Sequence, residues 1–316
     1  QQQAKLYADC LEAQFGQHVG HDGAGWPGAD GSGGFQRREV HAVPLGEDAL
    51  SRRGFARAER RSGHDPDLSA ERAVEYLKQG FTAIKFDPAG PYSAFDGRQL
   101  SLEALELCER FVRQLREAVG NKADLLFGTH GQMTAAGAIR LARRLEPYDP
   151  LWFEEPVPPD SPEEMAKVAR ATTIPIATGE RLTTKYDFAR LLQAGSAAIL
   201  QMNLGRVGGI LEAKKIASMA EVHHVQIAPH LYCGPVVGAA NIQLATCSPN
   251  FLILESIERW QGFHADILKK PVKWQDGYVI PPTEPGLGVE LNEEVARQHP
   301  YKGTMLHLEM AGHPIR

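Results

Sequence analysis

The chain has 316 residues, of which 43% are hydrophobic and 23% charged, and its formal net charge is −5. This is a globular composition, and the mild charge, with Lys and Arg spread among acidic residues, argues against a nucleic-acid-binding or membrane-binding surface. The four cysteines form no CxxC pair, which favours a reducing, cytoplasmic compartment over a disulfide scaffold or a zinc knuckle. The sequence has no long apolar run and no signal-peptide pattern. We therefore expect a soluble protein whose partner is a small molecule.

Two unlike segments come first in the chain. Residues 1–10 contain KLYADC, a β-like run that ends in polar residues, and we predict that they form a first β-strand. Residues 11–66 are rich in Gly and Arg and show no sustained hydrophobic period. That composition predicts an irregular loop or insertion.

Residues 67–262 alternate helical patterns with short apolar runs, which is typical of βαβ units and a parallel sheet. After a first interval of 43 residues, the polar residues that end these runs recur every 23 to 27 residues, one βα unit each. With the first strand, this predicts an α/β fold of the (β/α)8 TIM-like barrel type, in which the strand ends share one mouth. An open doubly wound sheet is the alternative, but it needs a Gly-rich phosphate turn that is absent. The run-ending residues are Asp87, His130, Glu154, Glu180, Asn203, His230 and Glu255.

The last segment, residues 263–316, resembles a hairpin followed by a short helix. We predict a C-terminal appendage that packs on the barrel or on a capping domain.

Glu154 and Glu180 end consecutive strands, so their carboxylates should lie side by side at the mouth. Two buried anions repel each other unless a cation or a proton intervenes, and Mg²⁺ prefers a few carboxylates with waters and substrate oxygens. The alternative is that these glutamates are solvated or paired with Arg181 and Lys185. Glu155 should point to the other side and be structural.

His230 and Lys85 should flank the proposed metal. A base or an acid on each side of a metal-bound substrate is the arrangement that removes a proton α to a carboxylate. Each residue alone is also compatible with a structural role, although a Lys inside a parallel strand is unusual.

Six motifs in this order resemble the enolase superfamily, in particular its mandelate racemase/muconate lactonizing enzyme type and the acid-sugar dehydratases within it. The resemblance covers roughly residues 68–295. The motifs are GFTAIKFDPAGP, LARRLEPYDPLWFEEPVPPD, IPIATGER, QMNLGRVGGI, QIAPHL and GYVIPPTEPGLGVELNEE.

The resemblance implies a role for each strand-end residue. Glu154 and Glu180 would be metal ligands for Mg²⁺, His230 an acid/base catalyst, and Lys85 the catalytic or charge-neutralising group opposite. Glu255 would help to bind the reacting substrate. Asp87 and Asn203 are further candidate substrate-binding residues. Family members are expected to form homo-oligomers, as dimers or octamers.

Three departures from the family pattern bear on activity. The third metal ligand of the family is an Asp on the third strand, and that position is Gly128 here. His130 lies two residues on and could replace the missing ligand, act as an acid for the leaving hydroxide, or do neither. The Asp that usually orients the catalytic His is Asn203, an uncharged amide, so His230 should be a weaker base and serve as an acid or a polar binder. We expect the α+β capping domain that precedes the first strand in the family to be largely absent here, either lost or missing from the given sequence.

The leading hypothesis is a Mg²⁺-dependent carbon–oxygen lyase that dehydrates a sugar acid. Lys85 or His230 would remove the α-proton, and His130 or His230 would assist the leaving hydroxide. A racemase, epimerase or cycloisomerase on the same scaffold is the second hypothesis. A catalytically impaired barrel that only binds ligands is the third.

Overall fold

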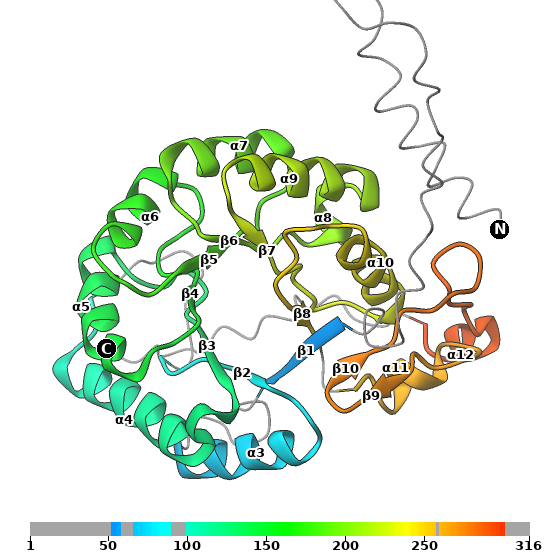
Figure 1. Ribbon diagram of the computed structural model, residues 1–316, viewed down its shortest axis with the longest axis horizontal. Helices are drawn as coiled ribbons and strands as arrows, with labels where there is room; N and C mark the ends of the chain where they lie inside the picture. The colour runs from blue at the N-terminus through cyan, green and yellow to red at the C-terminus, as the bar shows by residue number, and fades with distance from the viewer. Residues whose placement is uncertain (1–51, 58–65, 90–98, 257–258, 301–316) are drawn as a thin grey trace, which may run out of the picture. The chain divides into compact units, whose positions relative to one another are not determined.

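The structure, a computed structural model, describes residues 52–57, 66–89, 99–256 and 259–300. In these residues the strands β1 to β8 form a parallel barrel in which each strand pairs with the next through β7 (Figure 1). A β-bridge between Ile227 and Phe251 joins β7 to the residues just before β8. The strand β8 then pairs with β1, which closes the barrel. The predicted (β/α)8 fold is confirmed. The strands are β1 (Arg52–Arg57), β2 (Ala83–Phe86), β3 (Asp124–Gly128), β4 (Trp152–Glu154), β5 (Ile176–Thr178), β6 (Ile199–Leu200), β7 (Gln226–Ile227) and β8 (Leu254–Glu255).

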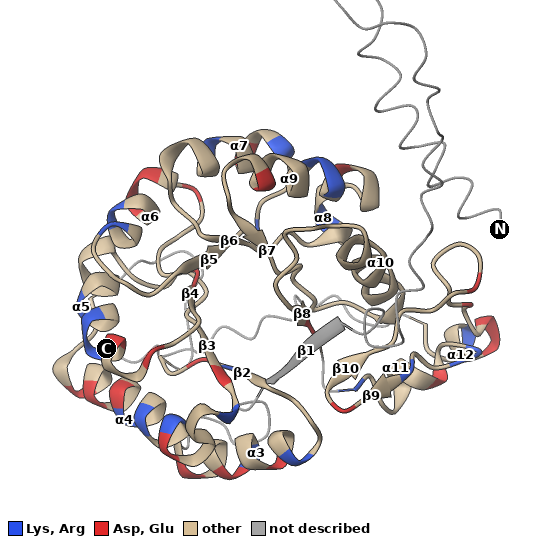
Figure 2. Cartoon of the chain, in the orientation of Figure 1, with Lys and Arg blue, Asp and Glu red and all other residues tan. Residues whose placement is uncertain are grey.

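Helices surround the barrel on its outside (Figure 1). Ser or Thr side chains cap several helix starts by accepting a backbone N–H, as Ser101, Thr134, Ser161 and Thr184 do. Acidic and basic side chains are interspersed over these outer helices (Figure 2). The helices are α3 (Pro66–Lys78), α4 (Leu102–Val119), α5 (Ala135–Leu145), α6 (Pro162–Ala169), α7 (Lys185–Ala194), α8 (Leu204–Val207), α9 (Ile210–Val222) and α10 (Pro235–Thr246), with short 3-10 turns at Gly120–Lys122 and Glu146–Tyr148. In the described part of the chain, no helix is long and apolar enough to cross a membrane.

The interior of the barrel is filled by side chains and is not a pore. One buried residue from each of the segments that contain β2 to β8 contributes to a single apolar cluster. Three alanines and four larger residues share this cluster, so that the layer fills the narrow barrel. Polar chemistry is therefore restricted to the strand ends above it. The cluster contains Ala83, Leu126, Trp152, Ala177, Ile199, Ala228 and Ile253.

The first barrel strand differs from the sequence prediction. Residues 52–57 form β1 and occupy the place between β8 and β2, inside the segment predicted to be irregular. The predicted strand at residues 1–10 lies outside the described residues. The run RRGFAR has three arginines, a glycine and only two apolar residues, so it carries no strand pattern of its own. Its conformation follows from backbone pairing with two neighbouring strands.

The C-terminal segment packs against the barrel as far as the structure describes it. The hairpin of β9 (Trp274–Gln275) and β10 (Tyr278–Val279) pairs antiparallel with the beginning of β1, at the end of the barrel opposite the mouth. The turn of the hairpin also lies against the loop between α3 and β2. A Cβ added to Gly80 in that loop would lie 2.3 Å from the backbone of Asp276, so only glycine permits the approach. The helices α11 (Phe263–Asp266) and α12 (Glu293–Gln298) complete the appendage.

Candidate active site

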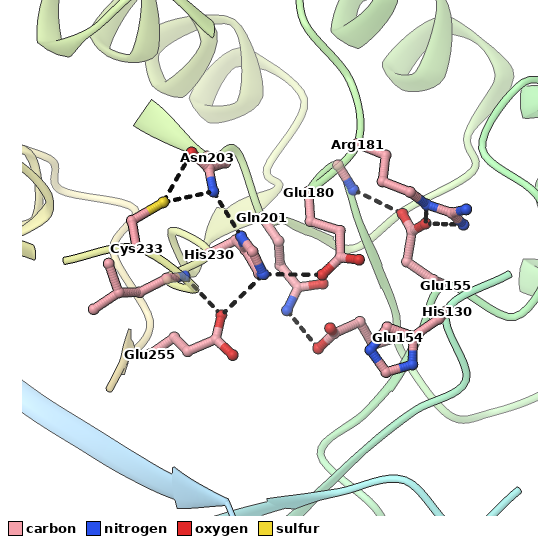
Figure 3. Close-up of polar contacts among 12 residues, drawn as sticks. His130, Glu154, Glu155, Glu180, Arg181, Gln201, Asn203, His230, Cys233 and Glu255 are labelled. Carbon is pink, nitrogen blue, oxygen red and sulfur yellow. Dashed lines mark hydrogen bonds and ion pairs between the residues drawn. The ribbon is translucent and has the colours of Figure 1, made fainter. Parts of the chain in front are cut away.

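The mouth of the barrel gathers all of the predicted site residues. Figure 3 shows most of them, contributed by the ends of neighbouring strands. Those from β2, β4, β5, β6 and β8 are buried, and the two histidines are partly exposed, at 21% for His130 and 13% for His230. A cluster of ionisable groups this buried needs specific partners for each charge. The buried members are Lys85, Asp87, Glu154, Glu180, Asn203 and Glu255.

Lys85 lies between two carboxylates. Its Nζ is 2.6 Å from Oε1 of Glu154 and 2.9 Å from Oε1 of Glu255. The other oxygen of Glu154 accepts hydrogen bonds from Gln201 at 2.7 Å and from the Trp152 indole at 3.2 Å. Opposite charges this close favour the ionised form of each partner, so Lys85 is held as an ammonium.

Glu180 and Glu154 differ in their environments. Burial raises the pKa of Glu180, but the nearby side chains of His230, His130, Lys85 and Arg181 lower it by more than burial raises it. The net result is a pKa of about 2. For Glu154, burial raises the pKa, Lys85 lowers it, and the neighbouring carboxylates of Glu255 and Glu180 raise it again, with a net upward shift. Glu180 is therefore the permanently ionised carboxylate of the mouth, and Glu154 depends on Lys85 for its charge.

Glu155 fixes the turn that carries Glu180. Its carboxylate accepts hydrogen bonds from Nε and Nη2 of Arg181 at 2.9 and 2.6 Å, from the Gly179 N–H at 3.2 Å, and from the Thr178 hydroxyl. Glu155 itself is fully buried and has a left-handed backbone, with φ of 48°. These contacts agree with the structural role expected from the sequence.

Asn203 holds His230 in one orientation. The Asn203 Oδ1 accepts the backbone N–H of Gly205 at 2.9 Å, which directs its NH₂ group to Nδ1 of His230, also at 2.9 Å. On the other side of the ring, Nε2 lies 3.1 Å from Oε2 of Glu180 and 4.0 Å from Oε2 of Glu255 (Figure 3). The ring thus accepts at Nδ1 and faces acceptors at Nε2.

His130 is held by Asp87 from the neighbouring strand end. Its Nδ1 lies 3.1 Å from Oδ2 of Asp87, and Oδ1 of Asp87 accepts the Ala89 N–H at 2.9 Å. The backbone of His130 is left-handed, with φ of 52°, and the next residue, Gly131, donates its N–H to the carbonyl of Glu155. A non-glycine residue in this conformation is strained and is often found at functional sites.

The donor set of the mouth fits a hard divalent cation in charge. Three buried glutamates surround a single ammonium, and Glu180 remains ionised. In the described parts of the chain, no group of three His, Cys, Asp or Glu is arranged to hold a metal. A further oxygen donor is present, because Oε1 of Gln201 is buried without a hydrogen-bond partner. Glu154 and Glu180 are the residues that would hold the cation.

The third-strand position beside Glu154 carries no side chain. Gly128 pairs with Glu154 across β3 and β4, and a Cβ added to it would meet the Glu154 side chain at 3.4 to 3.6 Å. A side chain at residue 128 would therefore reach the proposed cation. His130, the candidate replacement, directs Nδ1 to Asp87.

Gln201, which donates a hydrogen bond to Glu154, is the residue of the mouth that the sequence reasoning missed. It lies two residues before Asn203, so strand alternation places both on one face of the sheet. An amide two residues before a strand-end polar residue is the signal that could have identified it.

Comparisons with known proteins agree with this architecture. The family described as Enolase C-terminal domain-like matches residues 69–295. The chain is 34% identical over 246 residues to a D-xylonate dehydratase of Haloferax volcanii, covering 77% of this chain and 60% of that protein. It is 34% identical over 236 residues to a D-gluconate dehydratase of Thermoproteus tenax, covering 74% of this chain and 47% of that protein. The chain thus spans about half to three fifths of the length of these relatives.

Among solved structures, similar chains carry the same barrel. The mandelate racemase/muconate lactonizing enzyme from Sulfitobacter sp. is 53% identical, with a TM-score of 0.80, over 84% of this chain and 68% of that one.

Proposed function

Since the chain belongs to the enolase C-terminal domain-like family, we propose that it dehydrates a sugar acid by removing the proton α to the carboxylate and then eliminating water from the β carbon. The observation that carries the proposal is the composition of the barrel mouth. Two imidazoles and an ammonium lie there, each within hydrogen-bonding distance of a carboxylate. The dehydratase names of the two relatives support the choice of water elimination.

The residues of the mouth supply the groups that this reaction needs. Lys85, an ammonium beside two carboxylates, offers positive charge where negative charge develops on a substrate carboxylate. His130 and His230 both lie close enough to Glu180 to lower its pKa, so a substrate near Glu180 would meet both imidazoles. Mg²⁺ held by Glu154 and Glu180 would supply Lewis-acid stabilisation of the negative charge on the substrate carboxylate.

The proposal is tested by incubating the chain and Mg²⁺ with a library of aldonates and aldarates in D₂O. We expect at least one substrate to give a 2-keto-3-deoxy acid. Deuterium at the α carbon without elimination would replace the proposal with a racemase or epimerase. Neither deuterium nor a keto acid from any substrate would leave a barrel that only binds ligands.

Cation binding is tested separately by calorimetric titration with Mg²⁺. Wild type should bind, and Glu154→Gln and Glu180→Gln should each weaken binding, because each removes a charged ligand. Glu163→Gln, on the outer helix α6, is the matched control and should bind as wild type does. Equal binding by all four proteins would contradict the assignment of the cation to the mouth.

A further inference from the structure

One ion pair joins two turns of the barrel mouth, the turn after β3 and the turn after β5. It consists of Glu155 and Arg181, and we call it the brace. On the basis of the proposed function, we propose that the brace positions His130 and Glu180, which these two turns carry, for the reaction. Glu155 follows β4, which lies between β3 and β5, so it can contact the ends of both neighbouring strands.

The main chain of Glu155 holds the turn after β3. Its carbonyl oxygen accepts the backbone N–H of Gly131 at 2.6 Å and the hydroxyl of Thr129 at 3.0 Å, on either side of His130. Glu155, His130 and Gly131 all have left-handed backbones, with φ of 48°, 52° and 71°. This conformation costs free energy in a non-glycine residue and persists only where surrounding contacts determine it. The position of His130 therefore depends on Glu155.

The side chain of Glu155 holds the turn after β5. Its carboxylate accepts the Thr178 hydroxyl and the Gly179 N–H, the latter at 3.2 Å. It also accepts Nε and Nη2 of Arg181 at 2.9 and 2.6 Å. These donors belong to the residues directly before and after Glu180. Hydrogen bonds between ionised groups are short and strong, so they fix the arrangement of this turn relative to β4.

Arg181 also lies against the first turn directly. A Cβ added to Gly131 would lie 2.2 Å from Nη2 of Arg181 and 2.9 Å from the carbonyl oxygen of Val157. A side chain at residue 131 would therefore displace the guanidinium from Glu155. In Figure 3 this guanidinium faces the Glu155 carboxylate beside Glu180. The two turns are thus connected twice, through the main chain of Glu155 and through Arg181.

The brace acts on the reaction through these turns. The Glu155 side chain is fully buried and is engaged by donors from three residues of the β5 side, so it positions other groups and does not contact the substrate. A displacement of about 1 Å in a reacting group can cost about 10²-fold in rate. His130 and Glu180 belong to different βα units, and the brace keeps their separation constant.

Effects that cross from one turn to the other distinguish the brace from a local disturbance. Histidine ring ¹⁵N NMR signals report on both turns, because His130 lies in the first and His230 contacts Glu180 of the second at 3.1 Å. Arg181→Lys keeps the charge but not the guanidinium, and it should shift the His130 signals. Gly131→Ala displaces the guanidinium from the other side, and it should shift the His230 signals.

Two controls make matched substitutions away from the mouth. Gly80→Ala adds a Cβ 2.3 Å from a neighbouring backbone atom at a φ of 91°, so it strains the opposite end of the barrel in the same way. Arg190→Lys makes the same exchange in an exposed ion pair on α7. Both should leave the ring signals of the mouth unchanged. The signals are assigned through His130→Gln and His230→Gln, and exposed His223 is the internal reference.

Calorimetric titration with Mg²⁺ gives a second readout. Gly131→Ala and Arg181→Lys should each weaken binding about 10- to 100-fold, the range for groups that orient metal ligands, and both controls should bind as wild type does. Urea denaturation establishes which variants are folded, and Arg181→Lys decides alone if Gly131→Ala does not fold. Unchanged His130 signals or unchanged Mg²⁺ affinity in folded Arg181→Lys would overturn the proposal, as would unchanged His230 signals in folded Gly131→Ala.

Activity separates the brace from the proposed function. For the aldonate or aldarate that wild type converts, Arg181→Lys should lower kcat by about 10²-fold with a smaller change in KM. If wild type forms no keto acid, the proposed function fails, while the NMR signals still decide whether the brace links the two turns. If keto acid forms and no effect crosses between the turns, only the brace is refuted.

Discussion

Removal of the Lys85 charge should destabilise the fold in a pH-dependent manner. In Lys85→Met the carboxylates of Glu154 and Glu255, each 2% exposed, lose the ammonium between them. At an effective dielectric constant near 20, a contact of this length corresponds to about 6 kcal/mol of attraction. Burying the ammonium in the fold also costs desolvation energy. Removal of one partner of a buried ion pair therefore lowers the free energy of unfolding of proteins by less than this attraction, typically by about 3–5 kcal/mol.

Protonation sets an upper limit on this loss. One of the two carboxylates can take up a proton, and its ordinary pKa is 4.5. At pH 8 the uptake costs about 5 kcal/mol, and at pH 5.5 about 1.4 kcal/mol, at 1.36 kcal/mol per pH unit. Glu154 is the carboxylate that should be protonated, because its pKa is already raised by burial and by neighbouring carboxylates. The variant should therefore lose about 5 kcal/mol relative to wild type at pH 8 and about 1.4 kcal/mol at pH 5.5.

Urea denaturation of both proteins at the two pH values measures this difference. Lys185→Met, which breaks the partly exposed pair with Glu212, is the matched control and should leave the free energy of unfolding close to that of wild type at either pH. A loss for Lys85→Met that is the same at pH 8 and pH 5.5 would refute the reasoning, since it would show that no carboxylate is relieved by a proton.

Three further changes test other parts of the mouth. Glu180 has a pKa of about 2 in the fold and an ordinary value of 4.5, so its ionisation stabilises the fold fully above pH 4.5 and ceases to do so as the pH falls toward 2. Urea denaturation should detect this loss, about 3 kcal/mol, in wild type and not in Glu180→Gln. Glu155→Gln should lower the free energy of unfolding by about 3–5 kcal/mol, because it leaves Arg181 without its buried partner, and equal stability would show that the pair adds nothing. Gly128→Asp should destabilise the cation-free chain, because the new carboxylate would face Glu154. The same substitution should tighten Mg²⁺ binding by about tenfold or more in calorimetry. Weaker binding would show that residue 128 does not face the cation.

The barrel could be predicted because its signal repeats. Each βα unit places a polar residue at a strand end after a buried run, and the spacing of these residues needs no knowledge of the tertiary contacts. β1 is the exception. Its sequence, RRGFAR, has no apolar alternation, and pairing with β2 and β8 determines its conformation. Such a strand is defined by residues distant in sequence, which local pattern cannot show.

The sequence predicted which residues meet at the mouth, but it did not predict their partners. Strand ends predict that Lys85 and Glu154 share the mouth, yet the ion pair between them depends on side-chain reach across the barrel. The Asp87–His130 contact joins residues 43 positions apart through a left-handed turn at His130, a conformation that no residue pattern requires of a histidine. For this reason the sequence left the role of His130 open.

Two of the three departures from the family pattern, Gly128 and Asn203, both change the charge of the mouth. Glu154, Glu180, Glu255 and Asp87 already place four buried carboxyl groups at a mouth with one buried lysine, and an Asp at residue 128 and another at residue 203 would add two more. Gly128 and Asn203 are neutral, so fewer buried charges need a cation or a proton for the fold to be stable. The same replacement at residue 203 removes the carboxylate that would place hydrogen on Nδ1 of His230. The mouth still contains one carboxylate–imidazole pair, because Asp87 contacts His130. This pair follows β2 and β3, whereas Asn203 and His230 follow β6 and β7, on the other side of Glu180 in the strand order.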